Sequence, residues 1–336
     1  MRNELQHFST AYTHSMYGTE QATSGKGRLR DSETPSADLC GMFASALSDH
    51  ARATLAQLPP TPGEQTFNYA SRCLGALLTT TPPDFLSRAD SLNVARPLRV
   101  LSLCAGAARI EEQILRHSTH PIQMTLLDAS RDLVQRAADR MAEVAPTHTV
   151  DCLVGDINQG LPGDLTYDVI LCVSALHHVA ELETVLAQCN ARLSEEGEFW
   201  SIGEQVGRNG NRLWPEALQA ANTAFSRLPP HLRRNAHTGQ ADTSIADTDY
   251  STGCFEGIRS EELDDLLDRY FVPVHIYRRN AFLWRLIDAT YGDNFHLDRP
   301  DELAHLHDLI VAEVVHWATG GRSTELHGVF RKKTVR

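Results

Sequence analysis

An apolar run, a run of small residues and an amphipathic pattern follow one another over residues 98–115, and this order most constrains the fold. After the breaker Pro97, apolar residues predict a short buried strand: Leu98, Val100, Leu101 and Leu103. Residues 104–108 carry only small side chains, and a helical pattern with one apolar face follows: Ile110, Ile114 and Leu115. A strand, a tight turn and a helix in this order let a ligand approach the backbone above the helix N–H groups. On this segment alone, an ordinary strand-to-helix turn fits equally well.

The alternation of strand and helix continues along the chain. Apolar runs predict further strands at 122–128, 148–154, 167–173 and 197–202. Helical patterns at 130–144 and 181–193 connect strands of this set, and the first opens on Ser130, a favoured N-cap residue. Strands that alternate with helices at this spacing predict an α/β fold with a doubly wound, mostly parallel sheet.

The sequence before this unit divides into two parts. Residues 1–36 are rich in Ser, Thr, Gly and charge and have little periodicity, which predicts a flexible leader. Helical patterns at 36–58 and 64–78 each end before a proline pair, and they predict an N-terminal helical cap over 37–96. Such a cap can pack against the rest of the chain or close over a ligand as a lid.

We expect one domain to span 97–336. Beyond residue 204, its predicted strands and helices no longer alternate regularly. Insertions are expected at about 205–257 and 281–320, the second helical and placed before the last strand. Pro273 predicts that the strand around it lies at an edge of the sheet or contains a bulge. In order, the expected elements are a helix at 211–228, a polar connection at 231–253, a capped helix at 260–270, a strand at 271–277, a largely helical segment at 282–319 and a strand at 326–330.

Composition argues against several classes of function. The net charge is −12, so the chain has no overall field that would hold a nucleic acid. No apolar run approaches the ~20 residues of a membrane span, and the first residues lack the apolar core of a secretory signal. Seven cysteines, an odd number with no Cys-x-x-Cys pair, favour reduced thiols over a disulfide framework. We therefore expect a cytoplasmic protein that binds neither nucleic acid nor membrane.

The residues that follow the predicted strands are the candidates for ligand binding, because open parallel sheets bind ligands outside the carboxyl ends of their strands. An acid at the end of the second strand, Asp128, can accept both hydroxyls of a ribose. A second acid after the third strand, Asp156, can hold an adenine amino group while Ile157 packs on the ring. Each acid alone also suits a helix cap or a turn. Their shared position favours a nucleoside ligand.

Here the sequence resembles the class I S-adenosylmethionine-dependent methyltransferases of the small-molecule type. The resemblance covers roughly residues 97–205, and the last two strands of that family plausibly match 270–278 and 324–332. The stretches that carry it are Val-Leu-Ser-Leu-Cys-Ala-Gly-Ala-Ala at 100–108, Leu-Leu-Asp at 126–128, Val-Gly-Asp-Ile at 154–157, Tyr-Asp-Val-Ile-Leu-Cys-Val-Ser-Ala-Leu-His-His-Val at 167–179 and Leu-Ser-Glu-Glu-Gly-Glu-Phe at 193–199.

The resemblance implies seven strands, the last inserted antiparallel, with S-adenosylmethionine as cofactor and S-adenosylhomocysteine as product. Gly106 and its neighbours would hold the methionine part, Asp128 the ribose, and Asp156 with Ile157 the adenine. The implied cofactor-binding residues are Ser102, Leu103, Cys104, Ala105, Gly106, Asp128, Ala129, Asp156, Ile157, Val173 and Ser174. The implied activity is O-, N-, S- or C-methylation of a small-molecule metabolite, in specialised metabolism.

The first motif departs from the family pattern. The family reads acid-x-Gly-x-Gly-x-Gly, whereas this chain reads Ser-Leu-Cys-Ala-Gly-Ala-Ala at 102–108. We expect the turn to survive provided that φ at Cys104 and at the alanines stays negative. Without the acid, the cofactor's ammonium group needs another partner, either a backbone carbonyl or Glu111.

Methyl transfer from a sulfonium is an in-line displacement, so the protein mainly aligns the acceptor, excludes water and, where required, removes a proton. His177 is the first candidate for a base because imidazole titrates near neutral pH, and His178 and Glu204 follow. A packing or capping role for His177 stays open, and some acceptors need no base.

Substrate choice is expected to lie with the helical cap and the insertions, which bring aromatic surface for a small-molecule pocket. The candidate substrate-binding residues are Tyr69, Arg72, Trp214, Tyr250 and Trp284. A core or surface role for Tyr69 and Arg72 is the alternative. The sequence also leaves a homodimer open.

The sequence also has to be compared with alternatives to an active methyltransferase. A catalytically silent member of the same fold, which binds cofactor or partners, stays open. A nicotinamide-dependent oxidoreductase needs Gly-x-Gly-x-x-Gly, and Cys104 and Arg109 stand where two of those glycines belong. A metal site is not expected, because the neighbours His177 and His178 would point different ways on a helix or strand, as would His305 and His307.

Overall fold

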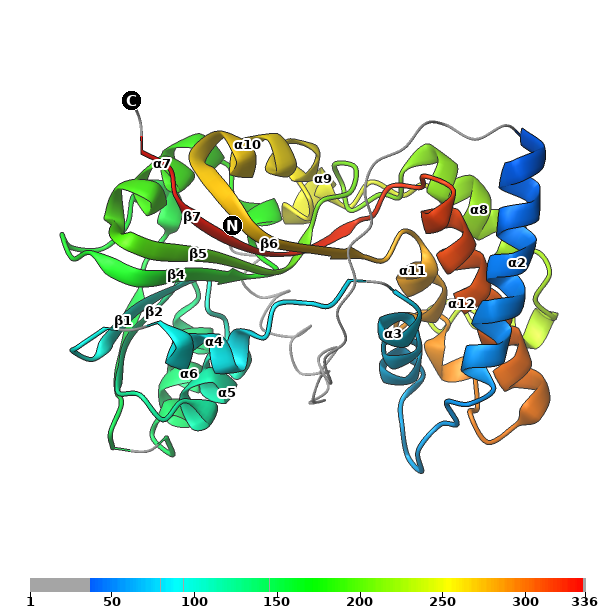
Figure 1. The fold of residues 1–336 in the computed structure, drawn as a ribbon, viewed down its shortest axis with the longest axis horizontal. Helices are drawn as coiled ribbons and strands as arrows, with labels where there is room; N and C mark the ends of the chain where they lie inside the picture. The colour runs from blue at the N-terminus through cyan, green and yellow to red at the C-terminus, as the bar shows by residue number, and fades with distance from the viewer. Residues whose placement is uncertain (1–36, 79, 93, 145, 335–336) are drawn as a thin grey trace.

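The computed structural model describes residues 37–78, 80–92, 94–144 and 146–334, so the leader expected at 1–36 lies outside the described residues. Figure 1 shows two parts side by side, a sheet with helices on both faces and a group of packed helices. Within the described ranges, none of the helices combines the length and apolar character that a bilayer crossing requires.

A seven-stranded sheet forms the first part, with the order β3-β2-β1-β4-β5-β7-β6. The strands are β1 (Leu98–Leu103), β2 (Ile122–Asp128), β3 (Thr149–Val154), β4 (Tyr167–Val173), β5 (Leu193–Gln205), β6 (Phe271–Arg279) and β7 (Glu325–Lys332). The first five run parallel, and β7 lies antiparallel between β5 and β6. This confirms the α/β, mostly parallel, seven-stranded fold with an inserted antiparallel last strand.

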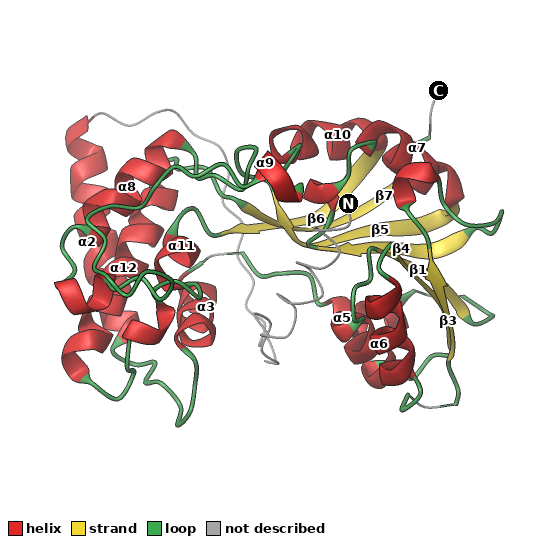
Figure 2. Ribbon diagram, turned by 180° about the vertical axis from the view of Figure 1, so that it is seen from behind, coloured by secondary structure: helices red, strands yellow, loops and turns green. Residues whose placement is uncertain are grey.

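Helices cover both faces of this sheet, as Figure 2 shows. On one face lie α4 (Phe85–Ser91), α5 (Arg109–His117) and α6 (Arg131–Met141), and on the other lie α7 (Leu182–Arg192) and α10 (Leu263–Tyr270). Alternate residues of β1 enter the two apolar clusters, Val100 on the α5 side and Leu101 on the α7 side. A strand that is buried on both faces reads as a continuous apolar run, which is why the sequence revealed it.

The packed helices draw on three separate stretches of the chain. They are α2 (Ala37–Leu55), α3 (Thr66–Leu77), α8 (Pro215–Phe225), α11 (Leu283–Ile287) and α12 (Pro300–Ala318). One apolar cluster joins them, with Tyr69, Phe225 and Phe282 among its fully buried members. Within the predicted cap, α2 and α3 thus pack against helices from both predicted insertions, whereas α4 packs on the sheet.

Several boundaries differ from the prediction. β5 begins at Leu193 instead of residue 197, and the pairing with β4 changes register between Tyr167 and Val169. α8 begins at Pro215 and not at residue 211, because proline suits the first helical position. The short helix α4 was not predicted. Ser130 caps α6 as predicted, and β6 is an edge strand with a register shift after Pro273, which confirms both alternatives for that residue.

Glu313 of α12 holds the start of α11. Its carboxylate is 2% exposed and accepts the backbone N–H groups of Ala281, Phe282 and Leu283, the last two at 3.0 Å. The first turn of α11 has no side-chain cap of its own, so this carboxylate replaces one.

We therefore expect Glu313→Ala to lower the free energy of unfolding by about 3 kcal/mol, since buried N–H groups lose a charged acceptor. Urea unfolding followed by circular dichroism measures this change. Glu195→Ala, at an exposed position of β5, serves as the control and should change little. Equal stability of both variants would contradict the capping role of Glu313.

Candidate active site at the carboxyl ends of the strands

The turn between β1 and α5 adopts a left-handed backbone at alternate residues. Cys104 has φ +51°, Gly106 +54° and Ala108 +54°. The condition of negative φ is therefore not met at Cys104 and Ala108, yet the turn forms. Hydrogen bonds from Ala105 N–H to the Leu127 carbonyl and from Ala108 N–H to the Ala105 carbonyl, at 3.0 and 2.8 Å, hold the turn in this shape. Such strain costs roughly 1–2 kcal/mol per residue and is typical of functional sites.

Asp128, at the end of β2, fixes this turn. One carboxylate oxygen accepts Gly106 N–H at 2.9 Å and the other accepts Ser130 N–H at 2.8 Å. Burial raises the pKa of Asp128 overall, although both hydrogen bonds oppose the rise. A carboxylate oxygen can accept more than one hydrogen bond, so Asp128 still has acceptor capacity for a ligand.

The second predicted acid lies beside the first. Gly155 N–H donates to the Asp128 carbonyl at 2.9 Å, which sets Asp156 at the same edge of the sheet. The Asp156 carboxylate accepts both the backbone N–H and the side-chain amide of Asn158 at 2.9 Å. Ile157, 4% exposed, joins the apolar cluster on the α7 face. The two acids that the strand ends predicted are thus brought together.

The space above Gly106 is open. A Cβ atom added to this glycine would meet no other heavy atom within 4 Å. A ligand can therefore approach the backbone at this point of the turn, as the run of small residues predicted.

Glu111 brings a carboxylate next to Ser102, the residue that stands where the family motif has its acid. Ser102 donates its hydroxyl to Glu111 at 2.5 Å, and the two residues are 0% and 1% exposed. Burial raises the pKa of Glu111 to about 6. A serine from β1 and a glutamate from α5 thus occupy the place of one acidic residue.

The raised pKa predicts how stability depends on pH. The folded-state pKa of about 6 exceeds the ordinary value of 4.5, so Glu111 lowers stability progressively as pH rises through this interval. The loss amounts to about 2 kcal/mol. Glu111→Gln keeps an acceptor for Ser102 without the charge. We expect this variant to gain stability relative to the wild type between pH 4.5 and pH 8, as measured by urea unfolding. A stability difference that is the same at both pH values would contradict the ionisation of Glu111.

Beyond β4, Glu204 organises the turn that carries the two histidines. Glu204 lies on β5, is 0% exposed and accepts the backbone N–H groups of Ala175, Leu176 and His177 at 3.2, 2.9 and 3.2 Å. Its carboxylate also lies 2.6 Å from Nδ1 of His177. Enclosed in this way, Glu204 positions His177 and does not face a substrate, which corrects its prediction as a base.

Glu204 and His177 each stabilise the charged form of the other. Burial alone would raise the pKa of Glu204, but His177 and the backbone N–H groups lower it overall. Burial alone would lower the pKa of His177, but the Glu204 carboxylate raises it overall. His177 is 2% exposed, and its Nδ1–H donates to Glu204, so Nε2 points away from that carboxylate.

His178 and Glu256 lie next to the Glu204–His177 pair, and these four residues form what is called the histidine centre below. The prediction that adjacent histidines point apart is wrong here, because they lie on a 3₁₀ turn (Leu176–His178) with ring centroids 3.9 Å apart. Nε2 of His177 and of His178 lie 3.7 and 3.6 Å from the two carboxylate oxygens of Glu256. Nδ1 of His178 lies 3.1 Å from the Phe255 carbonyl. Burial and the neighbouring His177 lower the pKa of His178 well below its usual value.

Two of the predicted substrate residues flank a residue that the sequence analysis missed. The guanidinium of Arg285 lies over the rings of Trp284 and Tyr250, 4.1 and 5.3 Å from their centroids. Arg285 donates to the Asn211 carbonyl at 2.5 Å, and the Asn211 amide donates to Glu256 at 2.9 Å. Tyr250 and Trp284 therefore connect to the histidine centre through Asn211.

The other predicted substrate residues lie elsewhere. Tyr69 is 0% exposed, and its hydroxyl donates to the Leu58 carbonyl at 2.9 Å and lies 2.6 Å from Nε2 of His307. Arg72 pairs with Glu64 at 2.8 Å. The structure thus gives Tyr69 a core role and Arg72 a surface ion pair, the alternative that the sequence left open. Trp214 donates to the Ser323 carbonyl at 3.0 Å and lies under Arg322.

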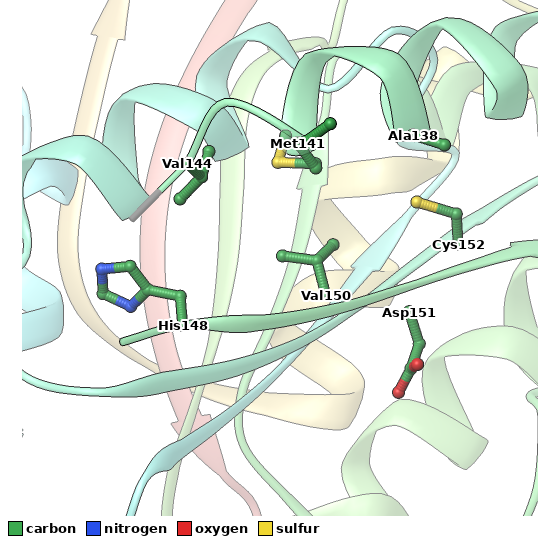
Figure 3. A pocket seen from close by; sticks show the side chains of 8 residues that line it. Ala138, Met141, Val144, His148, Val150, Asp151 and Cys152 are labelled. Carbon is green, nitrogen blue, oxygen red and sulfur yellow. The ribbon is translucent and has the colours of Figure 1, made fainter. Parts of the chain in front are cut away.

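A cavity of about 360 Å³ lies apart from this site, between α6 and β3 (Figure 3). The cavity is lined by Ala138, Met141, Ala142, Val144, His148, Val150, Asp151 and Cys152. It plays no part in the site described above.

Comparison with known proteins identifies a domain in one part of the chain. Residues 101–199 match the family model described as a methyltransferase domain. None of the curated proteins compared with the chain matches its sequence. The sheet is the seven-stranded one of the class I methyltransferases, with its last strand inserted antiparallel. The match runs from β1 into β5, so it shows a methyltransferase domain in this segment, which is less than a third of the chain.

Solved structures to which the chain is similar have low sequence identity and TM-scores below 0.5. An S-adenosylmethionine-dependent methyltransferase from Clostridium acetobutylicum is 18% identical, with a TM-score of 0.30, over 36% of this chain and 48% of that one. The glycopeptide N-methyltransferase MtfA, complexed with sinefungin, is 14% identical, with a TM-score of 0.38, over 75% and 87%. The PH0226 protein from Pyrococcus horikoshii is 13% identical, with a TM-score of 0.39, over 74% and 89%.

Proposed function

We propose that the protein transfers a methyl group from S-adenosylmethionine to a small-molecule acceptor. The observation that carries this proposal is the meeting of the Gly106 turn, Asp128 and Asp156 at adjacent strand ends, within the segment that matches the methyltransferase domain. An open turn with two neighbouring carboxylates suits a nucleoside that bears a positively charged sulfur.

In this proposal each part of the cofactor has its own partner. Asp128 accepts the ribose hydroxyls, and Asp156 accepts the adenine amino group beside Ile157. The 104–108 turn holds the methionine part, and Glu111 offers the ammonium group the carboxylate that the first motif lacks. The remaining contacts come from residues that adjoin these strand ends: Ser102, Leu103, Ala129, Val173 and Ser174.

The reaction breaks the bond between sulfur and the methyl carbon as the acceptor atom bonds to that carbon. The electron pair stays on sulfur, which becomes the neutral thioether of S-adenosylhomocysteine. A hydroxyl acceptor must also lose its proton. His177, held by Glu204, presents an Nε2 lone pair that binds either a proton or a metal cation. The rest of the rate enhancement comes from alignment of the acceptor with the methyl group and from exclusion of water.

The residues around the histidine centre favour a small, anionic molecule as the methyl acceptor. Arg285, stacked on Trp284 and Tyr250, offers a planar guanidinium that suits a carboxylate or phosphate. The net charge of −12 argues against a nucleic acid as substrate. We assign the protein to the cytoplasm and to the biosynthesis of a specialised metabolite, and a homodimer is compatible with this role.

The proposal is tested by incubating the full chain with S-adenosylmethionine and a panel of small carboxylic acids, phenols and amines. Mass spectrometry then measures S-adenosylhomocysteine against a no-acceptor control. We expect acceptor-dependent product with at least one class, the acidic acceptors first. Cofactor binding without product from any acceptor would favour the catalytically silent alternative, and a protein that binds no cofactor would contradict the proposal.

A further inference from the structure

We infer that His177, His178 and Glu256 form a binding site for one first-row divalent cation, contrary to the expectation from sequence. Two imidazole nitrogens and a carboxylate oxygen, one from each residue, all lie within 4.8 Å of one another. Two histidines with one carboxylate are a ligand set that zinc, iron and related ions use in enzymes.

The distances fit a shared ion better than hydrogen bonds. The two Nε2 atoms lie 3.7 and 3.6 Å from the oxygens of Glu256, beyond the range of an N–H···O bond. Two ligand atoms bound to one ion at about 2.1 Å, with a tetrahedral to trigonal angle, lie about 3.4–3.6 Å apart. Small side-chain adjustments would therefore bring all three groups onto one cation.

The outer partners orient both rings for metal binding. Nδ1 of His177 lies 2.6 Å from the Glu204 carboxylate, and Nδ1 of His178 lies 3.1 Å from the Phe255 carbonyl. Both partners are acceptors, so Nδ1 carries the proton in each ring and the lone pair is on Nε2. Metal-bound histidines characteristically donate their other N–H to a carboxylate or a backbone carbonyl. Asn211 similarly fixes Glu256 through its amide, at 2.9 Å.

Charge and access also suit a cation. Glu204 and Glu256 bring two carboxylates to the centre, and a divalent ion would balance them. The side chains of His178 and Glu256 are 17% and 24% exposed, whereas that of His177 is 3% exposed. Three protein ligands leave at least one coordination position for a further oxygen, which is typical of catalytic rather than structural sites.

This site would refine the choice of acceptor, a point that rests on the proposed function. The vacant coordination position suits an oxygen donor such as the hydroxyl of an acceptor. An acceptor hydroxyl bound there would release its proton to water and attack the methyl carbon as an oxyanion. The acceptors expected are therefore hydroxyl compounds, with O-methylation favoured over methylation of carbon or sulfur.

Binding is tested on the full chain after treatment with a chelator. The chain is titrated with CoCl₂, because Co²⁺ reports nitrogen and oxygen ligands through its visible absorption. We expect one equivalent to produce a visible band that added ZnCl₂ abolishes by displacement. His178→Ala and Glu256→Gln should each weaken Co²⁺ binding more than about 10-fold. His237→Ala and Glu195→Gln, at exposed positions, are the matched controls and should bind as the wild type does.

Circular dichroism verifies that each variant is folded, and wild-type chain without a visible Co²⁺ band would by itself overturn the site. Unchanged Co²⁺ affinity in both ligand variants would overturn it as well. Calorimetry with S-adenosylhomocysteine separates this inference from the proposed function. Cobalt binding that needs His178 and Glu256, in a chain that does not bind S-adenosylhomocysteine, would uphold the metal site and contradict the proposed function.

Discussion

Asp128→Ala is expected to weaken the binding of S-adenosylhomocysteine by about 1–3 kcal/mol, or roughly 5- to 150-fold. The substitution removes the proposed acceptor of the ribose hydroxyls. It also deprives Gly106 N–H and Ser130 N–H of the carboxylate that holds the turn against the end of β2. Isothermal titration calorimetry at fixed salt and pH measures the change.

A matched control separates this effect from a general change of charge. Asp132 lies in the first turn of α6 and is exposed, so Asp132→Ala removes a nearby charge without touching the turn. We expect that variant to bind within about 2-fold of the wild type. Wild-type affinity in Asp128→Ala would remove Asp128 from the cofactor site.

His177→Ala is expected to slow turnover about 10²-fold or more while the affinity for S-adenosylhomocysteine changes little. The imidazole is nearly fully buried, and Glu204 fixes its orientation, so the substitution removes a nitrogen that is held in one position. The loss is expected whether Nε2 binds a proton or a cation. Initial rates at saturating cofactor, with an acceptor found in the panel, measure it.

Glu204→Gln provides the companion variant. An amide in place of the carboxylate loses the negative charge and can donate a hydrogen bond to Nδ1, which would leave the proton of the ring on Nε2. We expect a comparable loss of turnover with cofactor affinity retained, because Glu204 acts through His177. Full activity of His177→Ala would assign proton removal or metal binding to another group.

Much of the fold could be predicted because its signals are local. The strands β1, β2 and β4 are short, mostly apolar runs, each with a small or acidic residue at its end or directly after it, and helical patterns follow β2 and β4. The start of β5 was missed because Glu195, Glu196 and Gly197 read as a turn. In the structure these residues continue a strand whose first residue, Leu193, pairs with Tyr167 across a register shift.

The candidate site was predictable only where it follows from strand ends. Asp128 is the last residue of β2, and Asp156 and His177 follow β3 and β4 within four residues, so the sheet brings all three to one edge. Glu256 and Arg285 come from long connections whose path no local pattern sets. Their roles depend on Asn211, which bonds to both and lies before α8.

The backbone conformation of the site was also not predictable from the sequence. The sequence analysis made the turn conditional on negative φ at Cys104 and Ala108, because alanine and cysteine rarely adopt the left-handed conformation that both have here. The hydrogen bonds of the turn and the Asp128 carboxylate impose it instead. Similarly, the two histidines were expected to diverge, since nothing local to the pair shows that they lie on a 3₁₀ turn fixed by Glu204.

A crystal structure of the full chain grown with S-adenosylhomocysteine tests the central claim most directly. We predict the ribose on the Asp128 carboxylate, the adenine beside Asp156 and Ile157, and the amino-acid part over Gly106. Ligand density at any other place, or none at a concentration that saturates binding in solution, would contradict a cofactor site at the carboxyl ends of β1, β2 and β3.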